Sequence, residues 1–385
     1  MRGVDNAARG GAPAWFLAAV LCAAAGCSAA GDEATPPSID VDDGTISLES
    51  KGGGHHAPNG KKLFERETFG GNGRTCATCH SAKTGTVSPL EAQKRYAKDP
   101  NDPLFRSIDS DDGVGRSFTR LLEDATIRVT IPLPPGWSLL DDPTATTVTF
   151  RRGIPTTLNV PSLDDVFMYD GRNTSLEEQA LGAINSHYQP LRQPTPAELS
   201  AIAAHQQTNP FFSDPKLRKF AQGGPAPTLP QGRTPAEKRG RRWFVRSAEG
   251  ICSHCHAGPM LDETSEFLLA PAPPGTRFFT AFVSELNKKN APVRTFVIQH
   301  ADGTTETLAS PDPGRALVTG NVADANTFRI PTLWGAKDTA PYFHDNSART
   351  LEELASHYSD YFQIVIGTPL TPQDQADIIA YQKLL

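Results

Sequence analysis

The sequence predicts a mainly α-helical protein built from two similar halves in tandem, with short β insertions. The pattern Cys-x-x-Cys-His occurs twice, beginning at Cys76 and at Cys252. The tripeptide Ile-Pro-Thr begins at Ile154 and again at Ile330, so the two patterns recur at an identical offset. Because self-similarity at one fixed offset indicates internal repeats, we expect each half to be one copy of the same unit.

Helices are predicted at matching places in both halves. A Ser/Thr-x-x-Glu sequence, which caps helix N-termini, occurs at residues 175–178 and again at 350–353. The apolar residues that follow have helical rather than alternating spacing. The sequence therefore predicts helices over 176–187 and 351–362, and further helices that lead into the Cys-x-x-Cys-His patterns over 59–64 and 235–246.

Short strands are expected only in insertions between these helices. β-branched and aromatic residues are concentrated at 127–131, 147–150 and 294–299. Proline and glycine mark turns at 132–135 and 302–303. The insertions should therefore add little β structure to the helical halves.

The Cys-x-x-Cys-His pattern is typical of covalent haem c attachment. Its two thiols bond to the porphyrin and its imidazole binds the iron as the proximal ligand. A zinc ribbon would place its cysteine pairs about 15–20 residues apart, and a redox dithiol needs no following histidine. The sequence thus predicts two covalently bound haem c groups, held by Cys76, Cys79 and His80 and by Cys252, Cys255 and His256.

The N-terminus predicts export from the cytoplasm. An apolar run over 14–25 follows two arginines and is too short to span a membrane, so residues 1–26 form a predicted signal. The run ends in Ala-Ala-Gly-Cys, which resembles a lipobox with Cys27 as the lipidated residue. Cleavage after the small residues 28–30 is the alternative. We expect a periplasmic protein, lipid-anchored through Cys27.

The predicted division of the chain follows from these features. Residues 27–58 are rich in Gly, Ser, Pro and Asp and should form a flexible linker. Residues 59–235 would form the N-terminal haem c domain and residues 236–385 the C-terminal one. Cys22 leaves with the signal, Cys27 carries lipid and four cysteines hold haem, so no cysteine is left for a disulfide.

Composition gives no sign of a nucleic-acid partner. The formal net charge of the 385 residues is −6, and no Lys/Arg block is long enough to offset it. A mildly acidic surface would suit a basic redox partner, although an ordinary solvated surface explains it equally well.

The second axial position differs between the two predicted haems. Tyr358 lies on the capped helix of the second half, and a phenolate can ligate ferric haem. His357 points about 100° away around the helix. The position that corresponds to Tyr358 in the first half is Ala183, which cannot bind iron. Gln179 and His187 lie four residues on either side of it and so share its face.

Two readings of the first haem remain open at this stage. Either Gln179 and His187 flank an open iron, as peroxide activation requires, or they are ordinary helix-surface residues and another side chain closes the haem. Apart from the initiator, the methionines are Met168 and Met260. Because Met260 is better explained by packing, a His/Met haem is not favoured.

With these motifs in hand, the sequence resembles the bacterial dihaem cytochrome c peroxidase and MauG family from about Gly60 onward. The resemblance rests on both haem motifs and on Tyr-Asp-Gly-Arg at 169–172 and Ala-Pro-Tyr-Phe-His-Asp at 340–345, each followed by its capped helix. It implies a peroxidatic N-terminal haem and an electron-relaying C-terminal haem. Tyr358 matches the distal Tyr of MauG-like members, and Gln179 matches the family's distal Gln. Tyr169 replaces the Trp that lies between the haems, and could still carry an electron.

Three departures from the family pattern matter. The acid/base Glu of the peroxidases is here Gln189, which cannot transfer a proton, so His187 is the predicted substitute. The calcium-binding Asn is here Gly153, which argues against calcium. The stretch from the first haem motif to Gly153 contains no His, so the first haem should lack the distal His that closes it in resting peroxidases.

Three functions are consistent with these residues. The first is reduction of H2O2 at the N-terminal haem, with electrons from a small cytochrome, a cupredoxin or an organic donor. The second is electron transfer alone, with both irons six-coordinate, which the loss of the Glu favours. The third is a MauG-like oxidase that modifies a partner protein, which Tyr358 favours.

Overall fold

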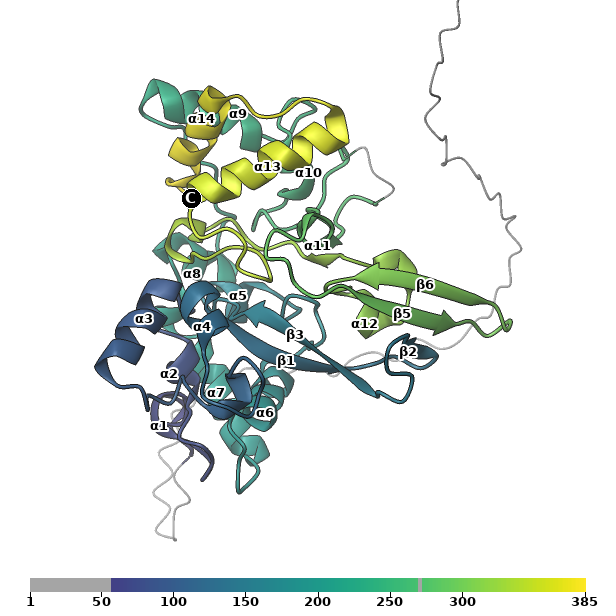
Figure 1. The fold of residues 1–385 in the computed structure, drawn as a ribbon. Helices are drawn as coiled ribbons and strands as arrows, with labels where there is room; N and C mark the ends of the chain where they lie inside the picture. Colours follow the sequence, from purple (N-terminus) through teal and green to yellow (C-terminus); the bar gives the residue numbers. More distant parts are fainter. Residues whose placement is uncertain (1–56, 269–271) are drawn as a thin grey trace, which may run out of the picture. The chain divides into compact units, whose positions relative to one another are not determined.

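The computed structural model describes residues 57–268 and 272–385, and Figure 1 shows their fold. The predicted signal, the lipobox Cys27 and nearly all of the linker lie outside these residues. None of the helices described is long and apolar enough to cross a membrane. Residues 55–385 group into one compact unit, so the division at 235/236 stays a prediction.

The fold is mixed rather than mainly α-helical. Helices account for 37% and strands for 13% of the described residues. The first part of the unit contains α1 (Gly60–Arg66), α2 (Cys76–Cys79), α3 (Pro89–Lys98), α4 (Thr119–Asp124), β1 (Thr126–Pro132), β2 (Trp137–Leu139), β3 (Thr147–Gly153), α5 (Val160–Leu163), α6 (Leu176–His187), α7 (Pro196–Gln206) and α8 (Pro215–Ala221). The later part contains α9 (Pro235–Phe244), α10 (Cys252–Cys255), β4 (Phe278–Phe279), α11 (Val283–Leu286), β5 (Arg294–Gln299), β6 (Thr305–Ser310), α12 (Ala316–Thr319), β7 (Phe328–Arg329), α13 (Leu351–Ile366) and α14 (Pro372–Gln382).

The strands account for the departure from the predicted class. The three predicted strands are present as β1, β3 and β5, but the two insertions do not stay separate. β2 from the first insertion pairs antiparallel with β5 from the second, and β6 completes a three-stranded sheet. In Figure 1 β5 and β6 extend side by side, with β2 and α12 next to them. The insertions thus join the two halves through backbone hydrogen bonds.

Equivalent helix pairs support the haem motifs in both halves. α1 packs on α7 at Gly60, where an added Cβ would lie 1.9 Å from the carbonyl oxygen of Ala201. α9 packs on α14 at Gly240, where an added Cβ would lie 2.0 Å from the carbonyl oxygen of Asp377. Only glycine allows backbones to approach so closely. Figure 1 shows α9, α10, α13 and α14 gathered together.

The predicted helix caps form, with one difference that recurs in both halves. Ser175 accepts a hydrogen bond from the Glu178 N–H at 3.1 Å, and Thr350 accepts one from the Glu353 N–H at 3.2 Å. In each case the Glu carboxylate accepts from the residue before the cap instead of the cap itself. The two helices therefore start in the same way at equivalent places in the two halves.

The two halves are tied together by buried polar contacts. Arg152 donates to both carboxylate oxygens of Asp312, at 2.7 and 2.8 Å, and to Asp170 at 2.5 Å. The Gly153 N–H donates to the carbonyl oxygen of His344 at 2.7 Å. A loop over residues 222–234 is the covalent link between α8 and α9. Leu217 of α8 packs in the same buried cluster as Phe244, Trp334 and Tyr381.

Candidate functional site

The first Cys-x-x-Cys-His sequence forms α2 and the residue after it. His80 is held by its Nδ1–H, which donates to the carbonyl oxygen of Gly85 at 2.7 Å. Gly85 has φ +64°, and an added Cβ would lie 2.6 Å from the backbone nitrogen of Thr157. Because Nδ1 carries the proton, Nε2 has a free lone pair, which is the tautomer and orientation of a metal-binding imidazole.

The second motif repeats this geometry in the second half. His256 follows α10, and its Nδ1–H donates to the carbonyl oxygen of Leu261 at 2.7 Å. Leu261 has φ +56°, in the same left-handed region as Gly85. A non-glycine residue held there has a backbone fixed by its surroundings, so both imidazoles are pre-oriented in the same way.

The four thiols of these motifs fit haem attachment better than the alternatives. None forms a disulfide. Burial raises the pKa of Cys76 to about 11 and the pKa values of Cys252 and Cys255 to about 12, whereas a redox dithiol needs a lowered thiol pKa. Among the residues described, no group of three or more His, Cys, Asp or Glu side chains could hold a metal ion by itself. The four thiols and two imidazoles are the residue types that the predicted haem c attachment requires.

The C-terminal end of α6 lies against the first motif. The Tyr188 hydroxyl donates to the sulfur of Cys76 at 3.3 Å, and Tyr188 itself is buried. The carbonyl oxygen of His187 accepts from the Asn72 side chain at 2.9 Å, and the carbonyl of Tyr188 accepts from the Asn72 N–H at 2.7 Å. These bonds fix the end of the helix beside the haem motif.

His187 is half-buried, and its ring nitrogen Nδ1 is shielded from solvent. Its Nδ1 has no hydrogen-bond partner among the described residues. Burial lowers the pKa of the His187 imidazole to about 4; the negative charge of Asp109 opposes this shift, and the positive charges of Arg74 and Arg172 add to it. A buried polar atom without a partner costs free energy, so we expect a water molecule or a bound group to satisfy this nitrogen.

The other predicted distal residue contacts a methionine. Gln179 lies on α6 two turns before His187, and its side-chain N–H donates to the sulfur of Met168 at 3.9 Å. Ala183 lies between Gln179 and His187 on the same face, because the helix is regular from Leu176 to His187. The structure therefore places the three predicted residues together and adds a fourth, Met168.

Tyr169 lies where the two halves meet. Its carbonyl oxygen accepts from the Arg329 N–H at 2.7 Å. Burial raises the pKa of its phenol, and smaller effects come from the charges of Arg329, Asp345 and Arg152. Residues from both halves thus surround the side chain predicted to pass electrons between the haems.

Tyr358 lies beside the second motif. Burial raises the pKa of its phenol, and the next contributions come from Cys255 and Cys252. Its neighbour His357 is tied elsewhere, since Nε2–H of His357 donates to the carbonyl oxygen of Ala281 at 2.7 Å. Tyr358, rather than His357, is therefore the side chain on α13 that lies near the haem thiols.

The structure shows the surroundings of Gln189 and Gly153, two positions at which the sequence departs from the family pattern. Gln189 is exposed, and its side-chain oxygen accepts from Asn72 at 3.2 Å. At Gly153 an added Cβ would lie 2.1 Å from the side-chain oxygen of Asn346, so an asparagine would not fit without rearrangement. The Asn346 amide instead donates to the carbonyl oxygen of Asp124 at 2.8 Å. The expectation against calcium stays a prediction.

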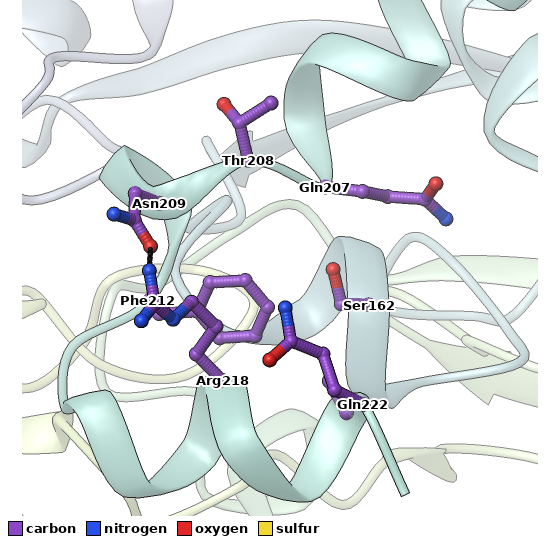
Figure 2. A pocket seen from close by; sticks show the side chains of 8 residues that line it. Ser162, Gln207, Thr208, Asn209, Phe212, Arg218 and Gln222 are labelled. Carbon is purple, nitrogen blue, oxygen red and sulfur yellow. Dashed lines mark hydrogen bonds between the residues drawn. The ribbon is translucent and has the colours of Figure 1, made fainter. Parts of the chain in front are cut away.

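A cavity of about 320 Å³ lies outside the candidate site. Figure 2 shows it between the end of α7, α8 and α5, with Arg218 donating a hydrogen bond to Asn209. Its lining is mostly polar and includes Gln207, Thr208 and Gln222. None of the predicted haem, axial or catalytic residues lines it, so it plays no part in the site described above.

Sequence reasoning missed the parts of the site that depend on contacts between distant residues. Tyr188, Asn72 and Met168 carry no motif of their own. A signal for Met168 did exist, because the duplication that aligns the two capped helices also aligns Met168 with Phe343. The contacts of Tyr188 with Cys76 and of Asn72 with α6 join residues that are far apart in the chain.

Comparison with known proteins agrees with the geometry. The model of the family "Di-haem cytochrome c peroxidase" matches residues 57–214. Cytochrome c551 peroxidase of Nitrosomonas europaea is 38% identical over 76 residues, which are 20% of this chain and 22% of that protein. Cytochrome-c peroxidase IdrP1 of Pseudomonas sp. (strain SCT) is 27% identical over 165 residues, which are 39% of this chain and 40% of that protein. The chain thus spans less than half the length of these two relatives.

A solved structure shows a similar fold over a longer stretch. It is described as a MauG-like protein associated with microbial copper homeostasis. Its TM-score is 0.50 at 19% identity, covering 85% of this chain and 87% of that one. The likeness is one of fold. The resemblance predicted from the motifs is confirmed: residues 57–214 match the model of the di-haem cytochrome c peroxidase family, and the relatives found are cytochrome c peroxidases and a MauG-like protein.

Proposed function

We propose that this protein is a dihaem c-type cytochrome that reduces H2O2 at its N-terminal haem with electrons relayed from its C-terminal haem. Cys76, Cys79 and His80 would hold the first haem, and Cys252, Cys255 and His256 the second. When bound, the haem irons supply the electrons that cleave the O–O bond. The observation that carries the proposal is the His187 imidazole, whose Nδ1 has no hydrogen-bond partner among the described residues, on the same helix face as Gln179.

His187 would move the proton that the reaction requires. Reduction of H2O2 to two waters takes up two electrons and two protons. A neutral imidazole can take a proton from the oxygen nearer the haem and return it to the departing oxygen, as general acid–base catalysis requires. Since burial lowers the pKa of His187 to about 4, the ring is neutral near pH 7 and can accept that proton. The Gln179 amide can only orient the substrate by hydrogen bonding.

The pH dependence of the reaction should report on His187. We expect kcat/KM for H2O2 to be flat from pH 8 to pH 5 and to fall as the pH drops through about 4, where the imidazole becomes protonated. The measurement is a pH–rate profile at saturating donor. A break near the ordinary histidine pKa of about 6.5 would show that His187 is not the buried base described here.

Tyr358 would bind the second iron through its phenol oxygen. Replacing Tyr358 with Phe should remove that ligand and convert one haem, and only one, towards the high-spin state in the electronic and EPR spectra. The control is Tyr361→Phe, because its ring lies 6.1 Å from that of Tyr358 on the same helix. Identical spectra for Tyr358→Phe and the wild type would contradict the assignment.

An assay of H2O2 consumption tests the proposed function. The purified dihaem protein would be given a reduced small cytochrome or cupredoxin as donor and tested both fully oxidised and half-reduced. Rapid turnover supports a peroxidase, and turnover without prior reduction supports a first haem that no histidine closes. No turnover in either state would leave an electron-transfer cytochrome, which the replacement of the acid/base Glu by exposed Gln189 favours.

Part of the proposal concerns the environment of the protein. We infer from the sequence that the chain is exported to the periplasm and lipid-anchored through Cys27. Its donor would then be a small periplasmic redox protein. A MauG-like oxidation of a partner protein is the other function to which Tyr358 would be suited.

A further inference from the structure

Two chain corners in this protein have the same backbone structure. In the first half, the Phe167 N–H donates to the carbonyl oxygen of Asn173 at 2.8 Å. At the equivalent place in the second half, the Tyr342 N–H donates to the carbonyl oxygen of Ala348 at 2.7 Å. Each pair forms an isolated antiparallel bridge. The same hydrogen bond therefore closes both corners.

The residue after each bridge is held in an unusual conformation. Met168 has φ +71° and Phe343 has φ +70°, although neither is glycine. Such a backbone is unfavourable for a residue with a Cβ and persists only where the surrounding structure holds it. α6 begins at Leu176 and α13 at Leu351, so each helix follows its corner residue at an equal spacing. Met168 and Phe343 thus occupy equivalent positions relative to the helices that follow them.

In the second half the corner residue packs beside the predicted iron ligand. The Phe343 ring lies 6.1 Å from the Tyr358 ring and 4.3 Å from the His357 ring, measured between centroids. Phe343 cannot bind a metal ion. The group that can bind one, the Tyr358 phenol, comes from the helix.

In the first half the side chain that could bind a metal ion lies at the corner and not on the helix. Ala183 takes the place of Tyr358 on the helix and offers no ligand. Met168 takes the place of Phe343 at the corner and carries a thioether. Its sulfur accepts the hydrogen bond from Gln179, the residue on the helix face that the candidate site assigns to the distal side of the haem.

We propose that the Met168 sulfur is a displaceable axial ligand of the first haem, opposite His80. A thioether is an established axial ligand of haem c, where it raises the reduction potential. The Gln179 amide would hold the sulfur in place, and H2O2 would have to displace it. This inference rests on the haem attachment in the proposed function. It departs from the expectation that a His/Met haem is not favoured, because the contact between Met168 and Gln179 is formed by the fold and is not visible in the sequence.

The test is spectroscopic and uses the purified dihaem protein. A ferric haem with a His/Met pair has a weak far-red charge-transfer band, and its ferrous form has a strongly upfield-shifted methyl resonance in the proton NMR spectrum. We expect both signals in the wild type and in Met260→Leu, and loss of both in Met168→Leu. Met260 is a matched control because it is buried in the core, 6% exposed. Leu conserves the volume of Met closely, so both variants should fold.

A second measurement gives a result on the wild type that does not depend on whether Met168→Leu folds. Binding of cyanide to the ferric wild type should reach a limiting rate set by dissociation of the sulfur. In Met168→Leu the rate should instead rise linearly with cyanide. A wild type without the thioether signals, or signals that survive in Met168→Leu, would overturn the inference.

The test of Met168 as a ligand and the test of peroxidase activity can give different results. Peroxide turnover without the thioether signals refutes the axial role of Met168 and leaves the peroxidase intact. Thioether signals without turnover in any variant support Met168 as a ligand and refute the peroxidase.

Discussion

Replacing His187 with Gln should lower kcat/KM for H2O2 by about 10²–10⁴-fold, the range that a positioned general acid–base contributes. Glutamine is close to histidine in size and can donate and accept hydrogen bonds, but it cannot carry a proton. The contacts that fix this end of α6 do not use the His187 side chain, because Asn72 bonds to the His187 backbone oxygen and the Tyr188 hydroxyl bonds to Cys76. We therefore expect both contacts to remain in the variant. The loss should therefore fall on proton transfer, measured as kcat/KM under steady-state conditions.

The control for this prediction is His300→Gln. His300 lies in the turn between β5 and β6 and contacts Glu306 at the surface, so its replacement should leave the rate unchanged. Restoring the family's Glu in the double variant His187→Gln, Gln189→Glu should recover part of the activity if position 189 can reach the substrate. An unchanged rate in His187→Gln would exclude His187 as the acid–base group.

The second large effect is expected on stability. Arg152→Met should lower the free energy of unfolding by about 3–5 kcal/mol, because removing one partner of a buried ion pair leaves the other buried and uncompensated. Arg152 is 1% exposed and is shared by Asp170 and Asp312. Burial alone would raise the pKa of Asp170, but attraction to Arg152 and Arg172 outweighs it and lowers that pKa. The check is denaturant unfolding followed by circular dichroism.

Arg246→Met provides the comparison for Arg152→Met. Arg246 pairs with Glu266, but both side chains are largely exposed. Surface pairs of this kind contribute little, so the unfolding midpoint should hardly move. If the two variants unfolded at the same denaturant concentration, the buried triad would not be the main link between the halves.

The sequence was most informative where a local pattern is sufficient. The helix predicted from Leu176 to about His187 has those bounds, because its cap and its end are both encoded within a few residues. The second capped helix was predicted to end at Phe362 and runs on to Ile366. The last residues, Ile364 to Ile366, are apolar but exposed, so apolar spacing did not mark them as helical. Gly367, with φ +72°, ends the helix.

Contacts between distant residues could not be predicted in this way. The pairing of β2 with β5 joins Trp137 to Ile298, and a strand of three residues has no local signal that selects such a partner. For the same reason the proportion of β structure was underestimated. His187 was predicted as the substitute for the acid/base Glu from the ordinary pKa of histidine. Burial lowers its pKa to about 4, and this burial depends on the fold and not on the neighbours of His187 along the chain.

The contacts between the halves should hold them together even if the peptide chain between them is cut. The loop over residues 222–234 is exposed or half-buried along its length and contains no helix or strand before α9. A protease that cut there would break the only peptide connection between α8 and α9. The two fragments would nevertheless stay together, through the β2–β5 pairing, the Arg152 triad and the packing of Leu217 against Trp334. Nicked protein should therefore elute as one particle that still contains both haems.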